Sequence, residues 1–86
     1  ISVGIAQDKA YTSAATGMPT SGVHDFIKND QPLRDGFVHT PRLVVFGGGY
    51  PVVIDGAVVG AIGVSGGHCS QDMEVAQAGL AAAGLV

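Results

Sequence analysis

The second half of the chain alternates β-branched residues, glycines and a tight-turn dipeptide in a pattern that predicts a β-hairpin. Asp55-Gly56 separates the apolar run at residues 52–54 from the run at residues 57–64. Asp-Gly is among the strongest two-residue signals for a type I′ turn, in which both central residues have positive φ. The glycines at 60 and 63 leave room for another backbone or a ligand. We expect both faces of this second strand to be at least partly covered.

A helix is predicted over residues 71–83, after the break at residues 65–67. Ser70 can cap its start, and Asp72 and Glu74 in its first turn have the charge that the helix dipole favours. Most of the following residues are alanine or glycine. The helix can therefore pack very close to a sheet or to another helix.

The first half of the chain shows helical spacing of its apolar residues. This spacing predicts a helix over residues 2–15, with Lys9 projecting beside the sheet, and a shorter helix over residues 21–28. Prolines and an Asp-Gly pair punctuate residues 29–42, which we interpret as a loop. Residues 43–46 are predicted to form a strand, and the three glycines that follow end it.

The glycine triplet at 47–49 and the loop at 65–70 are the two candidate anion sites. The triplet lacks the spacing of a phosphate-binding loop, so it is interpreted as a bend that leads into the hairpin. The second loop leads directly into a predicted helix N-terminus, where backbone N–H groups can hold a carboxylate, a propionate or a phosphate. The candidate ligand-binding residues are Ser65, Gly66, Gly67, His68 and Cys69, and simple turn geometry is the alternative.

The order of these motifs resembles the family that includes GlcG, the haem-binding protein HbpS and the C-terminal domain of PduO-type corrinoid adenosyltransferases. The resemblance rests on residues 48–51, 53–56, 60–67 and 71–80, with weaker matches at residues 2–13. It implies one α/β (α+β) domain over residues 1–86, with a mostly antiparallel sheet flanked by helices. It also implies an incomplete domain, because family members begin with a further helix and β-hairpin that this sequence does not contain.

Composition agrees with a chain that needs a partner. Hydrophobic residues make up 47% of the 86 residues and charged residues only 13%. A lone two-stranded sheet has edges that invite another chain, and so few charges leave apolar surface exposed. We expect a separate N-terminal chain, or a fragment of the same domain, to complete the fold, and a homo-oligomer to form from the result.

Charge and hydropathy exclude two classes of partner. The net charge is −3 and no basic stripe is present, which argues against nucleic acid. No apolar run reaches the length of a membrane span. One cysteine cannot form an internal disulfide. We expect a cytoplasmic protein, or a secreted one if a signal segment was removed.

Cys69 is the only thiol, and three roles are open to it: a nucleophile, an axial ligand of haem iron, or a small buried residue. A position at a helix start favours the thiolate, and His68 beside it could accept a proton. His24 and His39 are distant in sequence, so no local metal-binding spacing exists. The metal-ligand candidates are His68, Cys69, His24 and His39.

Two functions from different classes follow. The resemblance implies a small-ligand-binding subunit, with haem or another tetrapyrrole such as a corrinoid between sheet and helix or between subunits. The alternative is a proteolytically processed, two-chain enzyme that acts on a small organic substrate. Its proton-transfer groups would be Lys9, Tyr11 and Asp72, with thiol chemistry from Cys69. Asp72 is better explained by the helix dipole than by catalysis, whereas Tyr11 is equally explained by an aromatic position at the edge of the core.

Overall fold

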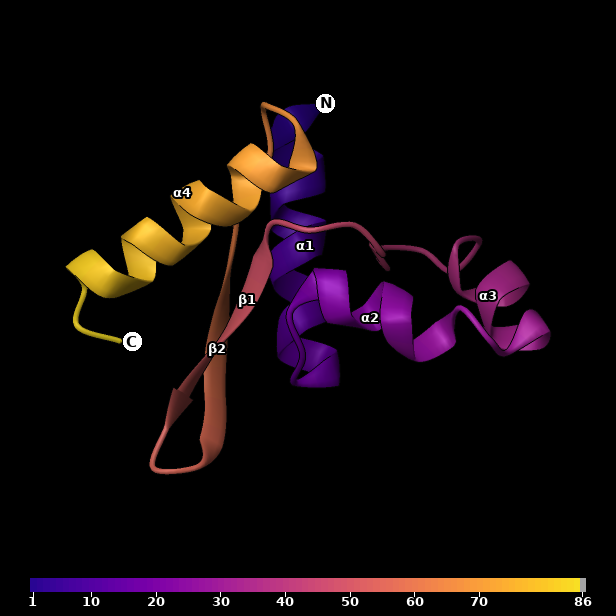
Figure 1. The fold of residues 1–86 in the computed structure, drawn as a ribbon, viewed down its shortest axis with the longest axis horizontal. Helices are drawn as coiled ribbons and strands as arrows, with labels where there is room; N and C mark the ends of the chain where they lie inside the picture. The colour runs from indigo at the N-terminus through magenta and orange to yellow at the C-terminus, as the bar shows by residue number, and fades with distance from the viewer. Residues whose placement is uncertain (86) are drawn as a thin grey trace.

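The computed structural model describes residues 1–85 and places helices around one antiparallel hairpin. Figure 1 shows α1 running beside the hairpin, α4 crossing near one end of it, and α2 leading away to α3. The α+β fold class is as predicted. In chain order the elements are α1 (Ser2–Thr16), α2 (Thr20–Ile27), α3 (Gln31–Phe37), β1 (Gly49–Ile54), β2 (Ala57–Gly63) and α4 (Cys69–Ala82).

The hairpin turn is confirmed at the predicted dipeptide. Asp55 has φ 51° and Gly56 has φ 80°, so both central residues are left-handed, as a type I′ turn requires. The pairing runs from Gly49 opposite Gly63 to Ile54 opposite Ala57. The register shifts after Val52, where β2 holds one extra residue, and such a bulge increases the local twist.

The helices α1 and α4 cover opposite faces of the hairpin at the end away from the turn. A side chain on Gly63 would collide with the backbone of α1 at Ala6 and Ala10, while Ile62 contacts Gly79 of α4. Successive residues of a strand point to opposite faces, so these neighbours place one helix on each side. Glycine at 63 is needed because the α1 backbone comes so close.

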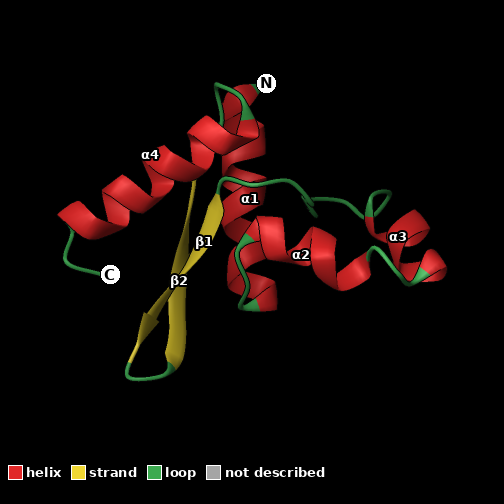
Figure 2. Ribbon diagram, viewed as in Figure 1, coloured by secondary structure: helices red, strands yellow, loops and turns green. Residues whose placement is uncertain are grey.

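The turn end of the hairpin has no such cover. Val53, Ile54, Val58 and Val59 are each between 42% and 61% exposed. Figure 2 shows this part of the two strands projecting beyond the helices. The prediction that both faces of the second strand are at least partly covered is therefore wrong for residues 57–59, which are exposed although the end of α1, at Gly17, comes near Val58.

Two other sequence predictions fail between the second helix and the hairpin. The expected loop contains α3, whose start is capped by Asp30: its carboxylate accepts a hydrogen bond from the Leu33 amide at 3.1 Å. The expected strand at 43–46 is irregular, because its backbone bonds to a side chain instead of a strand. The Val44 amide donates to the Thr12 hydroxyl at 3.0 Å. The bend at 47–48 therefore follows a loop.

The cap of α4 also differs from the prediction. His68 occupies the N-cap position, and its Nδ1 accepts a hydrogen bond from the Ser70 amide at 3.2 Å. The Gln71 side chain accepts in return from the His68 amide at 3.0 Å. This reciprocal pair is a capping box, so α4 begins at Cys69, two residues before the predicted start.

The interior is small and unusually polar. The buried apolar side chains are Val23, Ile27, Ala76 and Leu80, whereas the buried polar ones are Lys9, Thr12, Ser13, Thr20 and Asp72. Within residues 1–85, every such buried side-chain nitrogen or oxygen has a hydrogen-bond partner. No helix in this part of the chain is long and apolar enough to cross a bilayer.

The open hairpin generates a prediction about the isolated chain. Expressed alone, residues 1–86 will aggregate or remain partly unfolded. The two strand edges have unpaired backbone groups and four aliphatic side chains are exposed, so both can associate with another chain. Val59→Lys will reduce light scattering by charging this surface. Gln77→Lys adds the same charge on an exposed position of α4 and will not. A sharp, cooperative melt of the unmodified, isolated monomer would contradict the prediction.

Candidate functional site

A buried ion pair joins α1 to α4 across 63 positions of sequence. The Lys9 ammonium lies 2.9 Å from Oδ2 of Asp72, and it also donates to the Val64 carbonyl at 2.8 Å. The side chains are 1% and 6% exposed. The same ammonium lies 5.1 Å from the centre of the Phe46 ring, within cation–π range. The sequence prediction placed Lys9 beside the sheet, and the structure shows what it meets there.

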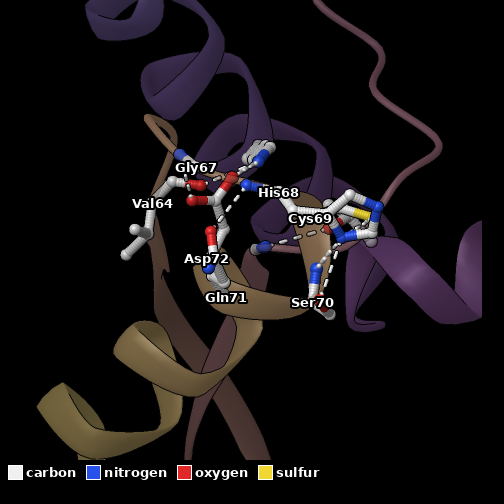
Figure 3. A network of polar contacts seen from close by, with 10 residues as sticks. Val64, Gly67, His68, Cys69, Ser70, Gln71 and Asp72 are labelled. Carbon is white, nitrogen blue, oxygen red and sulfur yellow. Dashed lines mark hydrogen bonds and ion pairs between the residues drawn. The ribbon is translucent and has the colours of Figure 1, made fainter.

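Asp72 has two partners, one on each carboxylate oxygen. Oδ2 accepts from Lys9, and Oδ1 accepts from the Gly67 amide at 3.1 Å. Figure 3 shows this carboxylate held between the end of β2 and the first turn of α4. The hydrogen bond from Lys9 lowers the pKa of Asp72 below its ordinary value, with smaller help from the Gly67 and Gly66 amides and against the opposing effect of burial. Asp72 therefore stays ionised at neutral pH.

Tyr11, the third catalytic candidate, does not join this pair. It is 43% exposed, and its ring stacks with the Arg42 guanidinium, whose carbon lies 4.0 Å from the ring centre. Arg42 also donates to Asp8 at 3.1 Å. Tyr11 thus holds the 38–48 segment against α1 on the surface, away from Lys9 and Asp72.

Amides of the loop before α4 and of the first turn of α4 donate hydrogen bonds to side chains of the protein itself. The Gly67 amide donates to Asp72 and the His68 amide to Gln71, and the Ser70 amide donates to the His68 ring. An anion at this helix N-terminus would have to displace these acceptors. The five candidate ligand-binding residues divide accordingly: Gly66, Gly67 and His68 build the turn and its cap, while Ser65 and Cys69 each line a pocket.

The pocket that includes Cys69 lies between α2, the 45–47 segment and α4, and we call it the α2–α4 pocket. Its volume is about 300 Å³. Its lining residues combine an aromatic ring and aliphatic surface with sulfur and imidazole donors: Ser21, His24, Val45, Phe46, Gly47, Cys69 and Met73. This set can hold an apolar, planar ligand and offer a donor to a metal at its centre.

The pocket that includes Ser65 lies between α1 and the end of β2, and we call it the α1–β2 pocket. Its volume is about 380 Å³, and its wall is formed by Ser2, Val3, Ala6, Gln7, Ala10, Gly63 and Ser65. None of these side chains carries a thiol, a thioether or an imidazole. The α1–β2 pocket can therefore hold a small apolar group, but it offers no metal ligand.

The four metal-ligand candidates are separated by the fold. His24 and Cys69 line the α2–α4 pocket, and the His68 ring lies beside the Cys69 sulfur, 3.9 Å from it. His39 lies in the turn after α3 and lines neither pocket. Within residues 1–85, no three His, Cys, Asp or Glu residues form a cluster suited to a metal ion.

Phe46 and Met73 are site residues that the sequence prediction missed. Phe46 was assigned to a strand that does not form. Met73 stands four positions after Cys69, and residues at that spacing share a helix face. The predicted helix began at residue 71 and left Cys69 outside, so it did not reveal this pairing. The position of Ser21 beside them depends on tertiary contacts alone.

Fold and pocket together define a class: an α+β protein whose helices flank an antiparallel hairpin and border an open, mostly apolar pocket that includes a thiol, a thioether and an imidazole. The chain belongs to the family described as haem degrading protein HbpS-like, whose model matches residues 1–81. It is 38% identical over 77 residues to an uncharacterized 15.0 kDa protein of Citrobacter freundii encoded in the dhaT-dhaS intergenic region. That match covers 88% of this chain and 54% of the relative.

Two solved structures share the fold. Protein ORFY of Klebsiella pneumoniae superposes with a TM-score of 0.84 at 31% identity, covering 96% of this chain and 58% of that one. The crystal structure of a PduOC:haem complex superposes with a TM-score of 0.81 at 37% identity, covering 91% and 57%. The chain thus spans little more than half the length of these relatives. The predicted family and fold are confirmed.

The buried pair generates a first prediction about stability. Lys9→Met will destabilise the folded protein by about 3 kcal/mol, because it leaves the Asp72 carboxylate buried without its counter-charge. Urea unfolding of the protein in the assembly in which it purifies, followed by circular dichroism, measures this loss. Asp72→Asn introduced into Lys9→Met will cost much less than in the unmodified protein, since the charge is then already unpaired. Equal costs in the two backgrounds would show that the groups do not interact.

The lowered pKa of Asp72 generates a prediction about acid. In the unfolded chain an aspartate takes up its proton near pH 4, whereas folded Asp72 does so only at lower pH. The stabilisation that ionised Asp72 gives the folded state is therefore present above about pH 4, and it is lost as the pH falls through the pKa of folded Asp72. The urea midpoint of the unmodified protein will fall over this window more steeply than that of Asp72→Asn. Parallel pH profiles would contradict this.

Proposed function

We propose that this chain is part of a small-ligand-binding subunit that holds haem, or a related tetrapyrrole, in an oligomer. The observation that carries the proposal is the α2–α4 pocket, which combines the Phe46 ring and the aliphatic part of Met73 with donors from Cys69 and His24. Haem iron is held in proteins by imidazole, thiolate or thioether ligands. The family description and the haem complex of PduOC support the same class of ligand.

The residues fit haem better in this pocket than in the other one. A tetrapyrrole needs flat apolar walls and a donor for its metal, and the α1–β2 pocket provides only the walls. Bound haem would supply iron-centred redox chemistry, for which the chain contributes position and electrostatics. A corrinoid is the second tetrapyrrole that this donor set admits.

Size indicates that the site is shared. At about 300 Å³ the α2–α4 pocket lies at the lower end of the range for small-molecule sites. We propose that the rest of the site, and the strands that cover the open half of the hairpin, come from a portion of the family domain outside these 86 residues. That portion belongs either to the same polypeptide or to a separate N-terminal chain. The relatives, of which this chain spans little more than half, support this proposal.

The positions of the three candidate catalytic residues give the enzyme alternative little support. Lys9 and Asp72 neutralise each other in the interior, and neither lines either pocket. Tyr11 lies on the surface against Arg42. Proton transfer by these three groups at a shared substrate would require the ion pair to open, so we favour the binding subunit.

Two tryptophan substitutions test which pocket binds haem. Ser21→Trp fills the α2–α4 pocket, and Gln7→Trp is the matched control in the α1–β2 pocket. In a haemin titration of the full-length protein, followed by visible absorption, Ser21→Trp will weaken binding at least about tenfold, since about 1.4 kcal/mol of lost contact has that effect. Gln7→Trp will bind as the unmodified protein does.

Native mass spectrometry of the protein purified from its source completes the test. A retained haem or corrinoid mass, together with the stoichiometry of chains, would support the proposed subunit. A stoichiometric small-molecule adduct of another class, with no haemin binding in titration, would refute the tetrapyrrole proposal. The reverse effect of the two tryptophans would move the site to the α1–β2 pocket.

A further inference from the structure

The segment at residues 38–48 is irregular, yet part of it forms a wall of the α2–α4 pocket. Val45, Phe46 and Gly47 line that pocket. A side chain on Gly47 would collide with Met73, so the segment packs directly on α4. Figure 1 shows the segment returning from α3 to β1 past α1. Because no helix or strand ladder holds it, other contacts must set its position and with it the shape of the pocket.

Two hydrogen bonds tie the backbone of this segment to α1. The Thr12 hydroxyl donates to the Arg42 carbonyl at 2.9 Å and accepts from the Val44 amide at 3.0 Å. Thr12 is fully buried, so water does not compete for these bonds. Both bonds lie before Val45, where the pocket wall begins.

The Arg42 side chain holds the same segment from the surface. Its φ of 68° lies in the left-handed region, which is costly for a residue with a Cβ. Such a residue persists where surrounding contacts offset the cost. The guanidinium makes contacts of this kind with two residues of α1: its carbon lies 4.0 Å from the centre of the Tyr11 ring, and its Nε donates to Asp8 at 3.1 Å.

The other arginine of the chain makes no comparable connection. Arg34 lies on α3, and its Nε is 3.7 Å from the carboxylate of Asp35, the next residue along the chain. That pair joins α3 only to itself. Arg42, by contrast, joins the segment that carries the pocket wall to a separate helix.

We propose that Arg42 is a positioning residue for the α2–α4 pocket. Its contacts with Tyr11 and Asp8 hold residues 43–48 in the place where Phe46 forms the pocket wall. Arg42 lines neither pocket, so it acts on a ligand only through this wall. Its effect on haem binding rests on the proposed function, whereas its effect on the wall does not.

The first test is a haemin titration of the full-length protein in the assembly in which it purifies, followed by visible absorption. Arg42→Gln will weaken binding about fivefold, the size expected from the loss of one exposed cation–π contact and one exposed ion pair. Arg34→Gln is the matched control, since it makes the same change of charge at a similarly exposed arginine, and it will bind as the unmodified protein does. Arg42→Lys keeps a positive charge beside Tyr11 and Asp8 and will recover most of the affinity.

The second test reports on the pocket wall without a ligand. Cys69 lines the same pocket, so the rate at which iodoacetamide alkylates it, followed by mass spectrometry of its peptide, depends on the position of the wall. Arg42→Gln will raise this rate about fivefold by the same loss of contacts, and Arg34→Gln will not. A general loss of stability would lower the urea midpoint without changing the rate, because the unfolded fraction in water is small.

The two readouts separate failure of this inference from failure of the proposed function. If the unmodified protein binds haemin and Arg42→Gln leaves the alkylation rate unchanged, the inference is overturned and the proposed function stands. If the unmodified protein does not bind haemin but Arg42→Gln raises the alkylation rate, the proposed function is overturned and the role of Arg42 in the wall stands. Equal effects of Arg42→Gln and Arg34→Gln would show a general effect of charge and would overturn the inference.

Discussion

The ion pair between Lys9 and Asp72 is the constraint on which the rest of the structure depends. An ammonium group away from water is stable only when its charge and its N–H donors are satisfied. Here Asp72 supplies the charge, the Val64 carbonyl a second acceptor and the Phe46 ring a third contact. One side chain of α1 thereby fixes the end of β2, the start of α4 and the loop before β1.

Glycines and hydroxyl groups make this arrangement possible. A side chain on Gly48 would collide with the Lys9 side chain, and one on Gly49 with its backbone, so glycine lets β1 reach α1 closely. The Thr20 hydroxyl accepts from the Gly49 amide at 2.9 Å. The interior is thus assembled by polar contacts as much as by its few apolar side chains.

The same contacts divide the molecule into a closed part and two open parts. Lys9 and Asp72 are buried together and line neither pocket. Phe46 serves both, because one ring lies over the Lys9 ammonium and also lines the pocket that includes Cys69. The turn end of the hairpin remains uncovered and apolar. The pocket and the uncovered end of the hairpin are the two surfaces on which the proposed ligand and the proposed further portion of the domain would bind.

The sequence by itself determined the elements whose signals are local. Asp55-Gly56 specified the hairpin, helical spacing specified α1 and α2, first-turn carboxylates after a glycine break indicated α4, and the succession of motifs identified the family. Tertiary contacts decided the rest. Residues 43–46 have strand composition but bond to the Thr12 hydroxyl, and Lys9 meets Asp72 although 63 positions separate them. The burial of the charged pair and the placement of Cys69 and His24 on one pocket depend on distance in space, which a local pattern does not encode.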